Sequence, residues 1–429
     1  MQHVTVQPAK AVRGEISVPG DKSISHRSIM FGSLARGTTT VRGLLRGEDN
    51  MATLNAFRLM GVQITDDGDL LTISGRGLHG LTEPDDVIDC GNSGTSIRLL
   101  SGLLAGQRFF SVLTGDKYLR KRPMKRVVTP LNRMGALIQG RDGGEKAPLA
   151  ITGTLLKGID YSSPVASAQV KSALLLAGLY ADGDTTVTEP HRSRDHSERM
   201  LAHFGARIRV TDTGASISGG EELEGREITV PGDISSAAFF LVAGLIVPGS
   251  ELLITGVGVN PTRTGIIDIL QAMGGDIQLL NQRELSGEPV ADLLVRSSAL
   301  KGIDIGGDVV PRAIDEFPVI GIAAALADGT TTVRDARELR VKETDRIVAT
   351  AENLRLAGVT VEETPDGMIV TGRGRLDSCT VDSRGDHRIA MAMLIGGLAA
   401  TGAVTVNDTE CIETSFPCFL QLLEQVARR

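Results

Sequence analysis

The sequence predicts an α/β protein of two similar lobes, each built from three copies of one unit that combines strands with a buried helix. Two observations lead to this prediction. A glycine followed by a β-branched or apolar strand recurs six times along the chain, and a segment near its start is repeated near its middle. Repetition of this kind indicates one supersecondary unit used several times, because a single copy cannot bury its own apolar face.

The recurring glycine-strand pattern lies at residues 37–41, 106–110, 183–187, 249–253, 329–333 and 402–406. Stretches of small and apolar residues precede these strands, as at 237–246 and 389–400. They are apolar on nearly every side, so we expect buried helices, and their Ala and Gly residues allow close packing. Most of the strands are followed by an amphipathic helix that ends in a glycine turn, and we expect these second helices to cover the outside.

The duplicated segment sets the expected lobe boundaries. Residues 14–21 resemble residues 226–233, and both copies end in Pro-Gly-Asp. Each copy opens a half of three units. We therefore expect one lobe over residues 21–230 and a second lobe over residues 1–20 together with 231–429. A cleft between two like lobes is a usual place for a ligand.

The first copy leads into a stretch with an unusual charge pattern. A strand over residues 15–18 is expected to end in the Pro-Gly-Asp turn, with a helical pattern from Ser28 onward. Lys22, Ser23 and Arg27 would then lie at or near a helix N-terminus, where N–H groups and the helix dipole attract anions. Cations are unfavourable there, so a bound phosphate or carboxylate would explain them. A solvated helix start is the alternative, and this stretch alone favours neither; its spacing does not fit a P-loop.

Similar loops lead into the other buried helices. They carry the residues Asn92, Gly94, Ser167, Ala168, Gln169, Asp315, His387 and Arg388. If the copies share a fold, the helix starts point the same way within each lobe and their dipoles converge on the cleft. Glycines such as Gly94 let backbone N–H groups approach a ligand closely. The sequence therefore predicts a local anion-binding site.

These charged residues also have ordinary structural interpretations. The basic loop before Arg122 fits a solvated surface run, although the following proline favours one positioned guanidinium. Lys342 and Arg346 fit an i,i+4 pair on a helix face. Asp315 fits a helix cap, and His387 fits a hydrogen-bonded turn residue. Their recurrence at equivalent places in the repeat favours a shared site.

Composition narrows the class of function. The chain has 429 residues, 41% of them hydrophobic, and a net charge of −7, which argues against a nucleic-acid coat. Its four cysteines form no CxxC pair or disulfide framework, which suits a reducing compartment. The start of the chain has no signal pattern, and the longest apolar run, 237–247, is too short to span a bilayer. We expect a cytoplasmic monomer that binds neither nucleic acid nor membrane.

Motifs for several common chemistries are missing from the sequence. It contains no HExxH, EF-hand loop, or GxGxxG after a strand. Metal, nicotinamide and serine-hydrolase chemistry therefore lack support. The remaining set of cations, carboxylates and one histidine suits acid–base chemistry on anionic substrates, without a cofactor or a metal.

The chain resembles one family along nearly its whole length, the 5-enolpyruvylshikimate-3-phosphate synthases (3-phosphoshikimate 1-carboxyvinyltransferases) of the shikimate pathway. The resemblance rests on the stretches PGDKSISHR, GNSGTSIR, KRPM, SAQVKSA, IDEFP, RVKETDR and DHRIAM, which occur in this order. SAQVKSA, residues 193–196 and residues 414–417 resemble the glyphosate-insensitive bacterial subgroup called class II. The resemblance implies two lobes, each of three βαβαββ units.

The resemblance also implies a reaction and a set of site residues. The enolpyruvyl group of phosphoenolpyruvate would pass to the 5-hydroxyl of shikimate 3-phosphate, with release of phosphate. The implied shikimate 3-phosphate ligands are Lys22, Ser23, Arg27, Ser167, Ala168, Gln169, Arg194, Asp315 and Lys342. The implied phosphoenolpyruvate ligands are Lys22, Asn92, Gly94, Arg122, Gln169, Arg346, His387 and Arg388. The implied catalytic residues are Lys22, Asp315 and Glu343, with Asp315 and Lys22 serving the hydroxyl and Glu343 serving C3.

Two departures from the family pattern affect these expectations. Many members have a Lys before the Phe-Pro near the C-terminus, where this chain has Glu413, Thr414 and Ser415, so a phosphoenolpyruvate contact from that loop is in doubt. Insensitive members often have Ala where this chain has Gly94. Gly94 is therefore expected to leave room for glyphosate as a competing ligand.

Two alternative functions stay open at this point. The UDP-N-acetylglucosamine enolpyruvyl transferases share the fold and the donor, but they usually have a reactive Cys in the loop that corresponds to residues 117–122, and this chain has none. A phosphometabolite-binding protein without catalysis is the second alternative. Binding alone would not require Asp315 and Glu343 among the cations.

Overall fold

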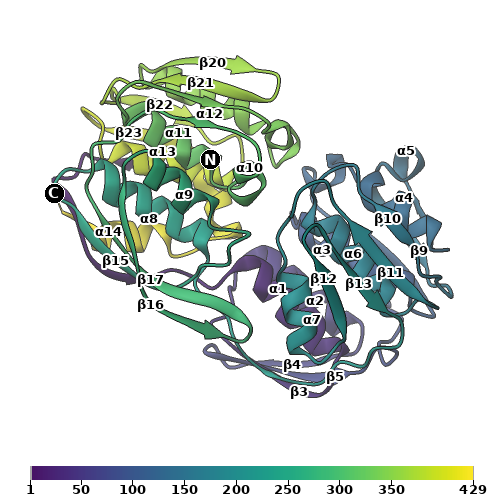
Figure 1. The fold of residues 1–429 in the computed structure, drawn as a ribbon. Coiled ribbons are helices and arrows are strands. Elements are labelled where there is room, and N and C mark those ends of the chain that lie inside the picture. The colour runs from purple at the N-terminus through teal and green to yellow at the C-terminus, as the bar shows by residue number, and fades with distance from the viewer. Residues whose placement is uncertain (1, 429) are drawn as a thin grey trace. The chain divides into compact units, whose positions relative to one another are not determined.

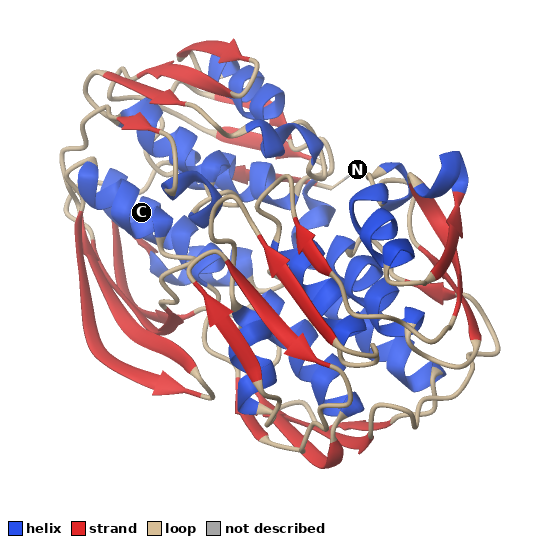
Figure 2. Cartoon of the chain, turned by 45° about the vertical axis from the view of Figure 1, so that its right-hand side comes forward, coloured by secondary structure: helices blue, strands red, loops and turns tan. Residues whose placement is uncertain are grey.

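The sheets of this protein follow one pattern of strand pairing in the computed structural model, which describes residues 2–428; Figure 1 shows the fold. Within this range, four sheets have four strands, one has three and one has five. Among these residues six sheets form, and each contains a parallel strand pair that an antiparallel strand extends. Figure 2 shows helices between the sheets. The repeat read from the sequence therefore corresponds to a repeated sheet, and the predicted α/β class is confirmed.

The chain divides into two compact units. Unit 1 comprises Met1–Pro19, Pro231–Arg283 and Pro289–Arg429, and unit 2 comprises Gly20–Val230 and Glu284–Glu288. The chain therefore passes from unit 1 to unit 2 after Pro19 and returns after Val230. Both passages lie in the duplicated segment.

Unit 2 contains sheets whose strand orders are β14-β3-β5-β4, β6-β7-β9-β8 and β10-β11-β13-β12. The strands are β3 (Arg36–Arg42), β4 (Gln63–Asp66), β5 (Leu70–Arg76), β6 (Ile88–Asp89), β7 (Phe110–Thr114), β8 (Leu137–Gly140), β9 (Lys146–Thr152), β10 (Asp160–Ser162), β11 (Asp184–Thr188), β12 (Ile208–Thr211), β13 (Gly214–Ser218) and β14 (Glu227–Thr229). The helices are α1 (Lys22–Leu34), α2 (Glu48–Leu59), α3 (Gly94–Ala105), η1 (Leu119–Lys121), α4 (Lys125–Arg133), α5 (Arg141–Gly144), α6 (Ala168–Gly178) and α7 (His196–His203).

Unit 1 contains sheets whose strand orders are β16-β17-β15-β2-β24, β18-β19-β21-β20 and β1-β23-β22. The strands are β1 (His3–Val6), β2 (Ala11–Ser17), β15 (Glu251–Gly258), β16 (Asp276–Leu285), β17 (Glu288–Arg296), β18 (Asp304–Ile305), β19 (Thr330–Val333), β20 (Thr360–Thr364), β21 (Gly367–Thr371), β22 (Cys379–Asp382), β23 (Val404–Asn407) and β24 (Ala427–Arg428). The helices are α8 (Ile234–Ile246), α9 (Gly265–Ala272), α10 (Val309–Arg312), α11 (Phe317–Leu326), η2 (Arg337–Val341), α12 (Arg346–Leu356), α13 (His387–Gly397), η3 (Thr409–Thr414) and α14 (Phe419–Val426).

The chain passes from one unit to the other within each copy of the duplicated segment. The strand β2 pairs in parallel with β15 of unit 1, and the next helix, α1, belongs to unit 2. The strand β14 pairs in parallel with β3 of unit 2, and the next helix, α8, belongs to unit 1. A Cβ atom at Gly20 would lie 1.9 Å from the carbonyl oxygen of Gly43, so the first passage requires glycine.

The helices at the centre of each unit are buried, as the sequence predicts. Their packing is close: a Cβ atom at Gly102 of α3 would lie 2.0 Å from the carbonyl oxygen of Ala173 in α6. In unit 1, α8 is buried from Ile234 to Leu245. Each unit has its own apolar core around these helices. Such cores hold side chains in fixed rotamers, which in turn fixes the helix ends.

The expected start of α1 was wrong. The helix begins at Lys22, not at Ser28, because the side chain of Asp21 accepts a hydrogen bond from the N–H of Ile24 at 2.9 Å. Lys22 and Ser23 are therefore the first helical residues. Arg27 lies a full turn further along and is buried, rather than standing at the helix tip. The strand before the turn is also longer than expected, from Ala11 to Ser17.

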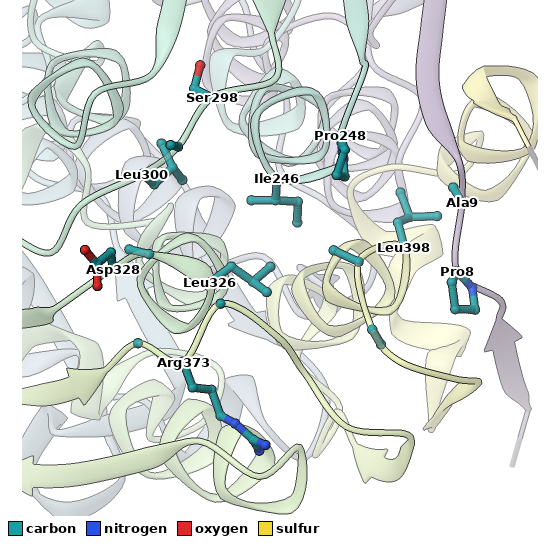
Figure 3. A pocket seen from close by; sticks show the side chains of 16 residues that line it. Pro8, Ala9, Ile246, Pro248, Ser298, Leu300, Leu326, Asp328, Arg373 and Leu398 are labelled. Atoms are coloured by element: carbon teal, nitrogen blue, oxygen red, sulfur yellow. The ribbon is translucent and has the colours of Figure 1, made fainter.

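A cavity of about 610 Å³ lies at the C-terminal ends of the central helices of unit 1. Ile246 of α8, Leu326 of α11 and Leu398 after α13 line it (Figure 3). The predicted site residues of this unit lie at or near the N-terminal ends of α11, α12 and α13. The cavity is therefore separate from them. Among residues 2–428, no helix combines the length and the apolar character that crossing a bilayer requires.

Candidate functional site

The predicted site residues form two groups, one in each unit. The group in unit 2 consists of Lys22, Ser23, Arg27, Asn92, Gly94, Arg122, Ser167, Ala168, Gln169 and Arg194. The group in unit 1 consists of Asp315, Lys342, Glu343, Arg346, His387 and Arg388. Most members of both groups lie at the start of a helix or directly before one.

In unit 2 the starts of α3 and α6 are joined by side chains. Arg98 of α3 donates from Nη1 to Oε1 of Gln169 at 2.6 Å, and Gln169 donates from Nε2 to Oγ1 of Thr95 at 3.0 Å. Ser93 and Ser167 cap the two helices through their hydroxyl oxygens. Gln169 is therefore held in one orientation. Arg98 was not singled out from the sequence, although it lies in one of the quoted motifs and is a charged residue in a buried helix.

The cations of α1 are fixed by neighbouring polar groups. The ammonium group of Lys22 forms an ion pair with Asp49 of α2. Arg27 donates to Oγ of Ser197 at 2.7 Å, to Oγ of Ser172 at 2.8 Å and to the carbonyl oxygen of Ser23 at 2.9 Å. Burial lowers the pKa of Arg27 to about 10, so the guanidinium remains charged at neutral pH.

Arg122 and Arg98 lie against the start of α3. A Cβ atom at Gly94 would fall 2.7 Å from Nη1 of Arg122 and 2.9 Å from Nη1 of Arg98. The interpretation of the basic loop as a solvated surface run holds for Lys117, which is exposed, but not for Arg122, which is half-buried. Asn92 donates to a carboxylate oxygen of Asp116 at 2.7 Å. Two guanidinium groups and the N-terminus of a helix thus meet around one glycine, an arrangement that favours an anion.

The start of α6 and the loop that carries Arg194 share a buried carboxylate, Glu189. It accepts from the N–H of Ser167 at 2.7 Å and from Oγ of Ser193 at 2.7 Å. Lys171 lies 2.9 Å from Glu189 and 2.8 Å from Glu198. Sequence spacing gave no signal for this cluster, because Glu189 belongs to none of the motifs.

Arg346 is the centre of the group in unit 1. Its side chain is 1% exposed and donates to Asp386 at 2.8 Å, to Asp315 at 3.2 Å and to Glu343 at 2.6 Å. Burial alone would lower the pKa of Arg346, but the carboxylates of Asp386, Glu343 and Asp315 outweigh it and raise the pKa above its usual range. The guanidinium therefore holds two of the predicted catalytic residues, Asp315 and Glu343, on one rigid group.

Two ordinary interpretations of this region were wrong. Lys342 and Arg346 do not form a pair on one helix face, because Lys342 precedes α12, which Asp345 caps. Both cations instead approach Oδ1 of Asp315, Lys342 at 3.3 Å. Asp315 is not the cap of α11 either, since Glu316 occupies the N-cap position.

The start of α13 joins the same network. Asp386 caps the helix by accepting from the N–H of Arg388 at 2.9 Å, and Arg388 donates from Nη1 to the carbonyl oxygen of Asp315 at 3.1 Å. His387 is buried, and its Nδ1 lies 3.5 Å from Oγ1 of Thr414. The C-terminal loop therefore contacts His387, one of the residues predicted to bind phosphoenolpyruvate.

A second buried network was missed from the sequence. Ser235 of α8 donates to Glu316, and Arg263 donates to Oγ of Ser235 at 2.7 Å and to Asp233 at 3.2 Å. These contacts join the starts of α8 and α11. Arg263 lies in a loop with no motif, so sequence spacing could not have identified it. Within residues 2–428, no group of three His, Cys, Asp or Glu side chains has the arrangement of a metal site.

Comparison with known proteins gives a consistent result. The model of the family described as EPSP synthase (3-phosphoshikimate 1-carboxyvinyltransferase) matches residues 6–423. Relatives named 3-phosphoshikimate 1-carboxyvinyltransferase from Geobacter sulfurreducens and Geobacter metallireducens are 75% and 73% identical over 429 residues, which is 100% of each chain.

Solved structures agree with this match. An EPSP synthase from Acinetobacter baumannii is 49% identical, with a TM-score of 0.90 over 100% of this chain and 98% of that one. The enolpyruvyl transferase NikO from Streptomyces tendae is 16% identical, with a TM-score of 0.77 over 98% of this chain and 96% of that one. The likeness to NikO concerns the fold alone.

Proposed function

The chain belongs to the EPSP synthase (3-phosphoshikimate 1-carboxyvinyltransferase) family, and we propose that it performs this reaction with the residues described above. The enolpyruvyl group of phosphoenolpyruvate passes to the 5-hydroxyl of shikimate 3-phosphate. The hydroxyl oxygen bonds to C2 of phosphoenolpyruvate while C3 takes a proton. C3 then loses a proton as the bond from C2 to the phosphate oxygen breaks, which releases phosphate.

The proposal assigns the cations to the two anionic substrates. Shikimate 3-phosphate is bound by Lys22, Ser23, Arg27, Ser167, Ala168, Gln169, Arg194, Asp315 and Lys342. Phosphoenolpyruvate is bound by Lys22, Asn92, Gly94, Arg122, Gln169, Arg346, His387 and Arg388. Arginines suit the second role because a guanidinium can bind a carboxylate or a phosphate through two parallel hydrogen bonds and stabilise charge during the addition.

One observation carries the catalytic part of the proposal: Asp315 and Glu343 accept from the same guanidinium, that of Arg346. The reaction needs one base for the hydroxyl proton and one group that serves C3, first as acid and then as base. We assign the first role to Asp315 with Lys22 and the second to Glu343. Carboxylates held on one rigid group keep a fixed separation, as two coordinated proton transfers require.

We also propose where the enzyme acts and with which partners. It acts as a cytoplasmic monomer on two small-molecule substrates, without a nucleic-acid or membrane partner and without a cofactor. Glyphosate competes with phosphoenolpyruvate. The four cysteines are free thiols, which fits a reducing compartment.

Phosphate release tests this function. The protein should release phosphate only when shikimate 3-phosphate and phosphoenolpyruvate are both present. Asp315→Asn and Glu343→Gln should each lower kcat by about 100-fold or more, since general acid–base groups typically contribute 10²–10⁴-fold. Glu362→Gln, which changes an exposed carboxylate of β20, is the matched control and should keep full turnover.

The same assay separates the alternatives. Phosphate release with UDP-N-acetylglucosamine in place of shikimate 3-phosphate would favour the related transferases. Binding of both substrates with no phosphate released would favour a protein that binds without catalysis. Full turnover in Asp315→Asn or Glu343→Gln would overturn the catalytic assignment.

A further inference from the structure

A buried charge cluster in unit 2 has no part in the chemistry described above. Lys171 of α6, Glu189 after β11 and Glu198 of α7 have side chains that are 2%, 1% and 3% exposed. Lysine and glutamate are seldom buried to this degree unless they are paired. Nζ of Lys171 meets both carboxylates, at 2.9 and 2.8 Å. Lys171 thus forms ion pairs with both glutamates, and Glu189 has further hydrogen-bond partners.

Glu189 uses both of its carboxylate oxygens to join two segments of the chain. Oε1 accepts from the N–H of Ser167 at 2.7 Å, at the residue that caps α6. Oε2 accepts from Oγ of Ser193 at 2.7 Å and from the N–H of Ser193 at 3.4 Å. The first segment continues into Ala168 and Gln169, and the second continues into Arg194. These four residues, Ser167 included, are proposed ligands of shikimate 3-phosphate.

The carboxylate of Glu189 is paired with a cation. A carboxylate close to an anion site would oppose binding if its charge were not compensated. Lys171 compensates Glu189, and Glu198 interacts with Lys171 and also raises the pKa of Arg27 against the effect of burial. Arg27 also interacts with Asp21, Glu288 and Arg194, so these groups belong to one network of opposite charges. Within it the charge of Glu189 is paired with Lys171, and Glu189 can act as a hydrogen-bond acceptor.

The hydrogen bond from Ser193 to Glu189 also limits which other groups this serine can bind. Its hydroxyl hydrogen is directed to Glu189, so Ser193 cannot donate the same hydrogen to a substrate phosphate. Ser193 is thus a tether for the loop. The neighbouring Arg194 is left as the charged group that this tether positions.

We propose that Glu189 is a positioning residue for shikimate 3-phosphate. Its hydrogen bonds fix the start of α6 and the Arg194 loop relative to each other, so that their hydrogen-bond donors are already in position when shikimate 3-phosphate binds. Groups held in a productive geometry save the entropy of ordering them on binding. This inference rests on the proposed function for the identity of the substrate. Glu189 affects binding through the residues that it positions and does not itself contact the substrate.

The test is Glu189→Gln, which keeps the shape of the side chain and removes its charge. We expect the KM for shikimate 3-phosphate to rise at least 10-fold, while the KM for phosphoenolpyruvate and kcat change less than 3-fold. The increase in Tm that shikimate 3-phosphate produces should shrink in the same variant. This second measurement reads binding without turnover.

A second variant and a control separate positioning from general stability. Ser193→Ala removes only the loop tether and should raise the same KM about 3-fold. In the double variant the two effects should not add, because both break one contact. Asp66→Asn is the matched control: it removes a carboxylate that binds Arg46 elsewhere in unit 2, and it should lower Tm with both KM values unchanged.

The outcomes are distinct. Lower Tm with an unchanged KM for shikimate 3-phosphate in both Glu189→Gln and Ser193→Ala would show a structural role only and overturn the inference. An equal rise in the KM values of both substrates would overturn it as well. If Glu189→Gln does not fold, Ser193→Ala alone decides. Absence of phosphate release by the unmodified protein would instead overturn the proposed function.

Discussion

Asp386→Asn should destabilise unit 1 by about 3 kcal/mol. Asp386 is 0% exposed and receives hydrogen bonds from Arg346 at 2.8 and 3.4 Å. Removing one partner of a buried ion pair typically costs 3–5 kcal/mol. We expect the lower end because Arg346 keeps Asp315 and Glu343 as partners. Asn retains an oxygen that can cap α13, so the cost of losing a helix cap, about 1 kcal/mol, should not be added.

The distribution of aromatic residues provides an assay for each unit. The chain has no Trp and three Tyr, at positions 118, 161 and 180, all within unit 2. Tyrosine fluorescence in a urea titration therefore follows unit 2, while far-UV circular dichroism follows both units. With a urea dependence of about 2–3 kcal/mol per M, the unit 1 transition should move down by roughly 1–1.5 M.

The comparison of the two signals decides the matter. The tyrosine transition should stay where it is in the unmodified protein. If the dichroism curve gives a loss of less than about 0.5 kcal/mol in the free energy of unfolding of unit 1, the account of Arg346 as a buried charge that needs all its carboxylates is refuted. A shift in the tyrosine signal alone would refute the assignment of the effect to unit 1. Asp386→Ala should cost about 1 kcal/mol more than Asp386→Asn, since it also removes the cap.

Two further predictions concern unit 2. Burial lowers the pKa of His26 well below its usual value near 6.5, and its Nδ1 lies 2.7 Å from Oγ1 of Thr53. Below about pH 6.5 the unfolded chain binds a proton there that the folded chain does not, so the free energy of unfolding decreases as the pH is lowered, by up to about 1.4 kcal/mol per pH unit. His26→Asn should lack this contribution, and stability–pH profiles that run parallel between pH 6.5 and 5 would contradict the prediction. Gly94→Ala should displace the guanidinium of Arg122, since the new Cβ would lie 2.7 Å from Nη1, while the fold is preserved because a flexible side-chain end can move. We expect the KM for phosphoenolpyruvate and the concentration of glyphosate for half inhibition to rise by about 10-fold or more, and identical inhibition curves for the two proteins would count against the expected space at Gly94.

The sequence was sufficient for the fold because the repeat is visible in it. Glycine before each strand and small residues in each central helix predicted both the unit and its buried helix. The boundary of α1 was missed for a local reason. Asp21 has the side chain of a helix cap, and Asp followed by a helix at once is an ordinary N-terminal pattern. The apolar periodicity that begins at Ser28 outweighed it.

The candidate site was predictable only where its residues lie in motifs. Arg98 lies within such a motif, but spacing does not reveal that Gln169, which comes from another copy of the repeat, faces it. Glu189 and Arg263 lie outside every motif, and each acts on residues that are distant in sequence. Contacts of this kind depend on how the helices pack, and sequence periodicity carries no information about them. The binding roles given to Lys22, Arg122 and the other site residues stay predictions.

The two passages of the chain between units have a consequence for the order of synthesis. Residues 20–230 contain every strand of the unit 2 sheets, because β14 completes the sheet of β3. Unit 2, apart from residues 284–288, can therefore fold while the ribosome is still making the rest of the chain. The strands β1 and β2 leave the ribosome before unit 2 but pair with β23 and β15, which emerge after it. The strand β2 must stay unpaired until β15 has emerged, and β1 must stay unpaired until β23 has emerged. A nascent chain halted soon after residue 230 should therefore carry a folded unit 2 preceded by unpaired β1 and β2.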